Sequence, residues 1–433
     1  MRRLAPLMIS LALVMATLPG QAATIQLQGT FVHAADVADA VAALRAVGLA
    51  PEATFGEVAV AYARVPSGLV ATLGRDARVT HLEADRPLAY FTAKPLVSTR
   101  TDVAVATLRD RTGQTIDGRG VGVAVIDSGA DATHPDLSRA VVKNQKFVGG
   151  LPVEMANSDD GGGHGTHVTG IVAGNGGSSG GLYKGIAPGS SLYVSGAGAG
   201  LNILFATQAM TWVLQNHAKV TPRIRVVNNS WGSTGAYNPN GVIEKITTQL
   251  VQAGVVVVWA AGNDGGNGSS DSTGSQAKHP IPGSLSIANY DDAGTGTRNG
   301  NLDPSSSRGA KADPTTWPDV SAPGANIMAT CRLAFPVCNA HLKPSRTYPN
   351  LYAELSGTSM AAPVVTGLVA LMLQADPSLT PARIEEILED TSTKFGSTPY
   401  ELRDTTNPDN SSSFDRGHGL VEAVAMLRAA GAS

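Results

Sequence analysis

The sequence predicts an α/β fold: a mostly parallel sheet with helices on both faces, preceded by a small α+β domain. Three patterns predict it. After residue 120, short β-branched runs alternate with helical segments, as in parallel sheets. Residues 24–90 follow the order β-α-β-β-α-β. Residues 364–373 are apolar without a polar face, which is typical of a helix buried on all sides.

Residues 1–23 have the features of a secretory signal peptide. Arg2 and Arg3 precede an apolar stretch at residues 4–18, and small residues follow it. We expect cleavage after Ala22 and a secreted product, either extracellular or periplasmic. The alternative is an N-terminal anchor, but the apolar stretch is short for a membrane span. No stable membrane association is therefore expected.

Residues 24–90 are expected to fold as a compact unit. Strands are predicted at residues 24–32 and 79–83, with a β-leaning segment within 50–63, and helices at 34–47 and 67–77. Residues 91–118 are mixed in character. The Lys94-Pro95 pair favours a linker there, with a processing site near residues 91–100.

From Gly120 onwards the pattern is that of a parallel sheet. Nearly continuous β-branched runs are expected for strands covered on both faces. Such runs lie at residues 121–126, 191–194, 224–227, 255–259 and 284–288. Helices are predicted at residues 164–173, 202–219, 241–253, 364–373 and 383–390. Pro363 is expected in the first turn of the buried helix, where no hydrogen-bond donor is lost.

The composition narrows the possible classes of protein. A hydrophobic fraction of 42% supports a large core, and 49 glycines indicate many tight turns. A net charge of −3, without a long run of like charges, gives no footprint for nucleic acid. The two cysteines, Cys331 and Cys338, predict one local disulfide in an exported chain.

Four polar residues stand at or just beyond the predicted ends of these elements. Asp127 follows the first β-branched run, and Asn263 follows the fourth. His164 and Ser359 begin helices. Functional sites of open parallel sheets gather beyond the carboxyl ends of the strands. We therefore expect these four residues to meet in one crevice.

These residue types suit nucleophilic hydrolysis of a peptide bond. Ser359 would supply the hydroxyl, and His164 would take its proton and return it to the leaving amine. Asp127 would accept the other imidazole N–H and fix the tautomer. Asn263 would offer an amide N–H to the oxyanion, with the main-chain N–H of Ser359 as the second donor.

Each of these residues also has a structural alternative. Ser359 could cap its helix, and Asp127 and Asn263 could stabilise turns. His164 and His167 could bind a metal, but they lack the glutamate and the i,i+4 spacing of a zinc-peptidase helix. His167 is more simply a buried, hydrogen-bonded neighbour, and no metal site is predicted. All the structural alternatives would have to hold together, which makes the catalytic interpretation the better one.

The motifs around these residues resemble those of the subtilases, the subtilisin-like serine peptidases. The match covers roughly residues 105–430 and follows the family's order. It rests on Ile126-Asp127-Ser128-Gly129, His164-Gly165-Thr166-His167-Val168, Ala261-Gly262-Asn263 and Gly357-Thr358-Ser359-Met360-Ala361. The resemblance implies a three-layer α/β/α subtilisin-like peptidase domain, with residues 24–90 similar to the family's inhibitory propeptide.

The resemblance also implies a domain plan and a substrate site. The plan is a signal peptide at residues 1–22, a propeptide at 23–95 that assists folding and blocks the cleft, and a peptidase domain at 96–433. Asn229-Ser230-Trp231-Gly232 resembles the edge strand that pairs with substrate. Ser230, Trp231 and Gly232 are therefore expected to bind substrate, with Trp231 narrowing the first pocket. Asp160 matches a position that lines the second pocket.

The family's strong calcium site is not predicted. Asp136 matches one of its carboxylates, but the loop at residues 174–181 lacks the other side chains. Calcium normally needs six to eight oxygen ligands. We predict no required cofactor, and structural calcium elsewhere is left open.

The sequence thus predicts a secreted serine endopeptidase made as a self-processing zymogen. Its expected partners are protein or peptide substrates and its own propeptide. One alternative is an inactive exported binding protein of the same fold, although a decayed site usually loses one of its members. The other is an esterase or amidase with the same triad, which the missing Gly-x-Ser-x-Gly motif makes less favourable.

Overall fold

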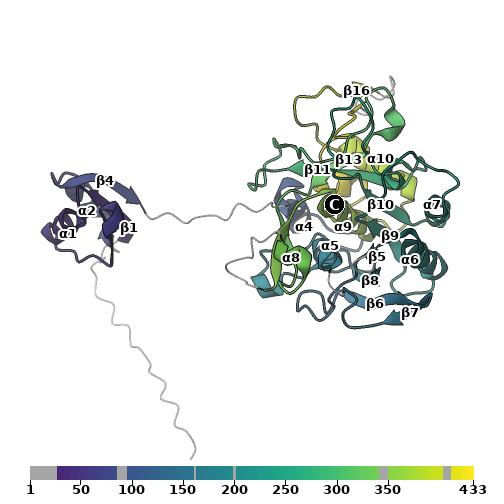
Figure 1. The fold of residues 1–433 in the computed structure, drawn as a ribbon, viewed down its shortest axis with the longest axis horizontal. Helices are drawn as coiled ribbons and strands as arrows, with labels where there is room; N and C mark the ends of the chain where they lie inside the picture. Colours follow the sequence, from purple (N-terminus) through teal and green to yellow (C-terminus); the bar gives the residue numbers. More distant parts are fainter. Residues whose placement is uncertain (1–26, 85–94, 160–161, 198–200, 341–349, 403–410) are drawn as a thin grey trace, which may run out of the picture. The chain divides into compact units, whose positions relative to one another are not determined.

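The computed structural model describes residues 27–84, 95–159, 162–197, 201–340, 350–402 and 411–433. The chain divides into two compact units, one ending at residue 89 and one beginning at residue 90 (Figure 1). The predicted signal peptide lies outside the described residues.

The first unit is a four-stranded antiparallel sheet with two helices. Its elements are β1 (Leu27–Ala34), α1 (Val37–Ala46), β2 (Ala53–Phe55), β3 (Val60–Pro66), α2 (Ser67–Leu73) and β4 (Val79–Ala84), with strand order β2-β3-β1-β4. Buried Val32 and Ala61 of the sheet pack with buried Ala43 and Leu44 of α1. The side chain of Asp36 accepts a hydrogen bond from the main-chain N–H of Asp39 and caps α1. The predicted α+β unit is confirmed.

The second unit is built on a nine-stranded sheet. Its main path runs β12-β11-β10-β9-β5-β8-β6-β7, and β13 pairs with β11. The strands are β5 (Gly122–Asp127), β6 (Val141–Val148), β7 (Leu151–Glu154), β8 (Ser191–Gly196), β9 (Ile224–Asn229), β10 (Val256–Ala260), β11 (Ser284–Asp291), β12 (Asn301–Leu302) and β13 (Val320–Pro323). Among the described strands of this sheet, only β7 and β12 pair antiparallel with their neighbours. The predicted mostly parallel sheet is confirmed.

Helices cover both faces of this sheet because its central strands are apolar on both sides. In β5, Val123 and Val125 pack into one hydrophobic cluster, and Ala124 and Ile126 into the other. The second cluster includes α6 (Ile203–Asn216) and α7 (Val242–Gln252). The first includes α4 (Thr101–Thr107), α5 (His164–Ala173), α9 (Thr358–Ala375), α10 (Pro381–Thr391) and α11 (Ala423–Ala429). The result is a three-layer α/β/α unit.

Helix α9 is the centre of the second unit (Figure 1). It contacts α5 and strands β9, β10 and β11. Among the described helices it alone has the length and hydropathy to cross a bilayer, yet 89% of it is buried within the unit. Its apolar character is therefore that of a core helix. Pro363 lies six residues into α9 rather than in the first turn, because the helix begins at Thr358.

Several strands have no apolar run in the sequence that would predict them. β6 carries Lys143, Asn144, Gln145 and Lys146 in succession, so it shows no β-branched run. It forms because it pairs with β8 on one side and β7 on the other. A separate two-stranded sheet, β14 (Ile327–Thr330) with β15 (Tyr352–Leu355), also escaped the apolar pattern. Both are decided by pairing partners rather than by local composition.

The segment before the sheet belongs to the second unit. α3 (Pro95–Ser98) and α4 follow residue 94 directly. Ser98, Thr99 and Thr101 are fully buried. The main-chain N–H of Ala423, at the start of α11, donates to the carbonyl oxygen of Thr99. Residues 95–107 are therefore packed structure and not a free linker.

Candidate active site

The four residues singled out in the sequence lie at the ends of elements that meet in one region. Asp127 is the last residue of β5, and Asn263 follows β10. His164 is the first residue of α5, and Ser359 is the second of α9. Strand β5 lies between β9 and β8, and neither of them is the next strand in the chain. Where the strand order changes direction in this way, an open parallel sheet has a crevice at the carboxyl ends of its strands.

Asp127 and His164 are hydrogen-bonded. The Nδ1 atom of His164 lies 2.7 Å from Oδ1 of Asp127. A carboxylate accepts, so Nδ1 carries the proton and Nε2 is left with a lone pair. Asp127 is buried, whereas the imidazole keeps 29% of its surface exposed. The other carboxylate oxygen, Oδ2, is buried and has no hydrogen-bond partner among the described residues.

The electrostatic environment favours the protonated imidazole. Burial by itself lowers the pKa of His164, but the charge of Asp127 and its hydrogen bond outweigh burial, so the pKa stands above its ordinary value. The buried carboxyl of Asp159 acts in the same direction. At a pH high enough for the His164 imidazole to be neutral, the imidazole therefore accepts a proton readily.

Asn263 has a fixed orientation. Its Oδ1 lies 2.9 Å from the main-chain nitrogen and 3.0 Å from the hydroxyl of Thr358. A main-chain N–H can only donate, so the atom that faces it is the carboxamide oxygen. The Nδ2 group therefore points away from Thr358. It makes no hydrogen bond to any residue that the structure describes, and Asn263 lines the cavities on both sides.

Ser359 is hydrogen-bonded to Ser230, the residue directly after β9. Its hydroxyl donates to the carbonyl oxygen of Ser230 at 3.0 Å, and within the described chain it makes no hydrogen bond to His164. The Ser230 hydroxyl in turn donates to the carbonyl oxygen of Ser359 at 2.7 Å. That oxygen is available because Pro363, four residues on, has no N–H to offer it. The proline thus frees an acceptor that ties α9 to the end of β9.

Two cavities adjoin Ser359 and Asn263. The first has a volume of about 260 Å³ and includes Trp231, Gly232 and Asp264 in its lining. The second has a volume of about 480 Å³ and includes His164, Val337 and Met360. A carbonyl carbon placed at Ser359 would therefore have protein walls on both sides. Each cavity is of a size for one or two side chains of a bound chain.

The predicted substrate-binding residues occupy different positions. Trp231 and Gly232 line the first cavity. The indole N–H of Trp231 donates a hydrogen bond to the carbonyl oxygen of Ile126 at 2.9 Å, and the ring is in edge contact with Trp259, so its position is fixed. Ser230 is buried behind Ser359 and does not line that cavity. β9 ends at Asn229, so residues 230–232 continue beyond the sheet. Asp160 lies outside the described residues.

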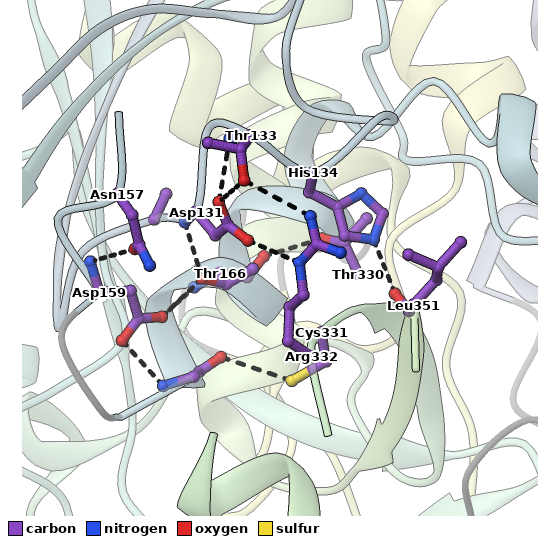
Figure 2. Close-up of polar contacts among 12 residues, drawn as sticks. Asp131, Thr133, His134, Asn157, Asp159, Thr166, Thr330, Cys331, Arg332 and Leu351 are labelled. Atoms are coloured by element: carbon purple, nitrogen blue, oxygen red, sulfur yellow. Dashed lines mark hydrogen bonds and ion pairs between the residues drawn. The ribbon is translucent and has the colours of Figure 1, made fainter. Parts of the chain in front are cut away.

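Asp159 is a buried carboxylate of this region that the motifs in the sequence did not reveal. Its carboxylate is fully buried and accepts hydrogen bonds from the main-chain N–H groups of Gly163 and Thr166 and from the Thr166 hydroxyl (Figure 2). α5 has no side-chain cap at Gly163, and Asp159 satisfies its free donors instead. Burial raises the pKa of Asp159. An acidic residue shortly before a helix start was the available signal.

His167 and Asp136 are engaged in protein contacts. His167 is buried, and its Nε2 donates to the carbonyl oxygens of Ala353 and Ile327 at 3.0 and 3.1 Å. Burial lowers its pKa to about 4, so the ring is neutral. The carboxylate of Asp136 accepts hydrogen bonds from the Tyr352 hydroxyl and the Ser178 main-chain N–H.

One group of carboxylates in the described chain could suit a hard cation. Oxygens of Asp319, Glu385 and Glu389 lie within 4.8 Å of one another. Asp319 already accepts a bond from the Ser286 N–H, and Glu385 one from the Gly283 N–H. None of the three lines the cavities at Ser359.

The predicted disulfide joins Cys331 to Cys338. Figure 2 shows Thr330, the residue directly before Cys331, beside Thr166 of α5. The Thr330 hydroxyl donates to the carbonyl oxygen of Thr166 at 2.9 Å. Arg332 donates to the buried carboxylate of Asp131 at 2.7 Å. The disulfide is therefore next to the helix that carries His164.

Comparisons with known proteins agree with this arrangement. The sequence profile of the Subtilase family matches residues 118–419. Subtilisin E of Bacillus subtilis (strain 168) is 32% identical over 351 residues, which is 80% of this chain and 78% of that protein. Subtilisin Savinase of Lederbergia lenta is 34% identical over 317 residues, covering 72% of this chain and 93% of that protein.

Solved structures share the fold. S41 Psychrophilic Protease superposes with a TM-score of 0.57 at 23% identity, covering 77% of this chain and 99% of its own. Sphericase gives a TM-score of 0.56 at 24% identity, covering 74% and 96%. Both likenesses concern the arrangement of helices and strands.

Proposed function

The chain belongs to the subtilase family of serine peptidases, and on that premise we propose that it is a secreted endopeptidase made as a self-processing zymogen. Ser359 is the nucleophile, His164 the general base and acid, Asp127 its orienting partner, and Asn263 an oxyanion donor. The observation that carries this assignment is the 2.7 Å contact between His164 and Asp127, with Ser359 lining the same cavity as His164. No described residue is hydrogen-bonded to Nε2 of His164.

The first step moves a proton from Ser359 to His164. Rotation about the Cα–Cβ bond takes the hydroxyl from the carbonyl oxygen of Ser230 towards Nε2, and costs one neutral hydrogen bond. Hydrogen bonds in unliganded sites often form fully only with substrate present. The serine oxygen then attacks the substrate carbonyl carbon, and the carbonyl oxygen takes the negative charge.

Two hydrogen-bond donors in the site stabilise that negative charge. One is Nδ2 of Asn263, which the bonds of Oδ1 to Thr358 leave free. The other is the main-chain N–H of Ser359, which has no hydrogen-bond partner in the described chain. Donors already in place need no reorganisation as the charge develops.

His164 then passes its proton to the leaving amine, and water repeats the sequence to release the acyl group. The imidazolium that forms between these steps is stabilised by the Asp127 carboxylate, in line with the raised pKa of His164. The first cavity, with Trp231 and Gly232, receives the side chain on the acyl side. Trp231 narrows it because the indole is fixed on Trp259.

Maturation removes the N-terminal region. We assign residues 1–22 to a signal peptide and the following unit, up to about residue 95, to an inhibitory propeptide. Because residues 95–107 are packed in the second unit, the cut is expected before Pro95. Asp160 is kept as a candidate for the second pocket.

Ser359→Ala tests the proposal. The full chain carrying this change should hydrolyse no peptide and should accumulate as an uncut precursor. The mature wild type should begin between residues 91 and 95 by N-terminal sequencing. Ser138→Ala, which removes an exposed hydroxyl, is the matched control and should be processed normally. Normal processing of Ser359→Ala by the purified protein would contradict the assignment.

Substrate type separates the alternatives. Casein hydrolysis and covalent labelling of Ser359 by a sulfonyl fluoride are expected together. Labelling with ester hydrolysis but no casein hydrolysis would indicate an esterase, and absence of both would indicate a binding protein.

A further inference from the structure

Residues 331–338 lead from the end of β14 into the first turn of the short helix α8 (Pro336–Ala340) and are closed by the Cys331–Cys338 disulfide. This segment is here called the disulfide loop. It lies against the two residues that precede His164. The main-chain N–H of Val337 donates to the carbonyl oxygen of Gly162 at 3.2 Å. The sulfur of Cys331 is 3.7 Å from the carbonyl oxygen of Gly163. A Cβ atom on Gly163 would stand 2.7 Å from the Cys338 sulfur, so only glycine admits the loop here.

The disulfide loop is also held at its entry. Arg332 is paired with Asp131, whose side chain is 5% exposed, at 2.7 Å (Figure 2). Phe335 packs with both cysteines and Ala353 in a small buried cluster. The disulfide loop is thus restrained by an ion pair, by apolar packing and by the disulfide bond. These restraints leave Val337 little conformational freedom.

Val337 lines the larger cavity beside Ser359. Leu355 and Met360 are the other apolar residues of its lining, and His164 belongs to it as well. The cavity with Trp231 does not include His164. Because His164 hands its proton to the leaving amine, the residue after the scissile bond departs on the His164 side. Its side chain therefore meets the cavity that contains Val337.

We propose that Val337, held in place by the disulfide loop, is a specificity-determining residue that favours an apolar side chain immediately after the scissile bond. The inference rests on the proposed function and adds a substrate class to it. Apolar contact with Val337, Leu355 and Met360 removes such a side chain from water. Glu354, 7% exposed, lies in the same lining and would instead favour a basic side chain if it dominated.

The test uses peptides that differ only in the residue after the scissile bond: leucine, alanine, lysine or aspartate. For the mature wild type, kcat/KM should be about tenfold higher for leucine than for alanine. Val337→Ala should reduce that ratio several-fold, and Val337→Asp should move the preference to lysine. Val142→Asp makes the same change at a half-exposed valine of β6 and should leave the ratio unchanged.

Breaking the disulfide provides a second test of the same proposal. The chain has only two cysteines, so a thiol reductant acts on this one bond. Reduced wild type, and the double variant Cys331→Ser/Cys338→Ser, should show the lowered leucine-to-alanine ratio of Val337→Ala. Titration with a sulfonyl fluoride counts competent enzyme, so partial unfolding lowers the count and not the ratio.

The outcomes are distinct. A wild type that prefers lysine would assign the cavity to Glu354 and overturn the inference. Variants that change kcat/KM equally for all four peptides, or not at all, would also overturn it while leaving the peptidase assignment intact. A wild type that cleaves none of the peptides and no casein would overturn the proposed function itself.

Discussion

Thr358 holds Asn263 by two hydrogen bonds, one from its main-chain N–H and one from its hydroxyl, at 2.9 and 3.0 Å. Thr358 is also the first residue of α9, directly before Ser359. The amide proposed to face the developing oxyanion and the helix that carries Ser359, the proposed nucleophile, are thus fixed by one residue. A small displacement of either would move both together.

The first prediction concerns this donor. Asn263→Ala should lower kcat by roughly 10²–10³ with little change in KM, because the lost bond forms only as the oxyanion develops. Thr358→Val, which keeps the main-chain donor but loses the hydroxyl, should give a smaller loss, and Thr358→Ser should restore most of it. Steady-state kinetics on one peptide series measures all three. A rise in KM alone for Asn263→Ala would argue against the oxyanion role.

The second prediction concerns pH. The imidazole must be neutral to act as base, and Asp127 holds the pKa of His164 above its ordinary value of 6.5. Activity should therefore fall as the pH drops through a value higher than 6.5. Asp127→Asn should move that acid limb to lower pH and lower kcat by about 10⁴. The pH profile of kcat/KM in both proteins is the measurement, and an unmoved limb would contradict the pairing.

The third prediction concerns the contact between α5 and the disulfide loop. Gly163 has φ of +83° and a prospective Cβ 2.6 Å from the Phe335 Cβ, whereas Gly113 has φ of +80° and open space. Gly163→Ala and Gly113→Ala thus share the backbone cost, and only the first displaces the loop. Gly163→Ala should lose about 1–3 kcal/mol more stability. Urea unfolding in the Ser359→Ala background, which avoids autolysis, provides the comparison; equal losses would mean that the loop yields freely.

The fourth prediction concerns the carboxylate group at Glu385. Burial and the charge of Asp319 raise its pKa to about 9, from 4.5 in the unfolded chain, with Glu389 and His418 also near. Between these values the folded chain holds a proton that the unfolded chain has lost, so stability falls as the pH rises. Glu385→Gln keeps an acceptor for the Gly283 N–H and removes this dependence.

Stability against pH measures that effect. In the Ser359→Ala background, Glu385→Gln should be more stable than its parent by about 1–3 kcal/mol at pH 8, and the two should converge near pH 4.5. Glu386→Gln, at an exposed position of α10, is the control and should show no such change. A variant less stable than its parent at pH 8 would mean that Glu385 is ionised in the fold.

Much of the fold could be predicted because its pattern is local. The runs that became β5 and β10 are apolar on both faces, and a strand of this kind is expected where helices cover both sides of the sheet. β6, with four polar residues in succession, gave no such pattern because a strand near the edge of a sheet is defined by its neighbours.

By itself, the sequence determined which residue types could carry the chemistry and at which element ends they stand, since turns and apolar runs are written in short segments. It pointed to Asp127, His164, Asn263 and Ser359. Only the tertiary structure decided which residues these four contact. Asp127 is hydrogen-bonded to His164, Thr358 to Asn263, and Ser230 to Ser359. Asp159 is the buried residue that caps α5. Hydrogen bonds and packing between positions far apart in the chain depend on distance and direction in space, and neither is encoded by any one segment.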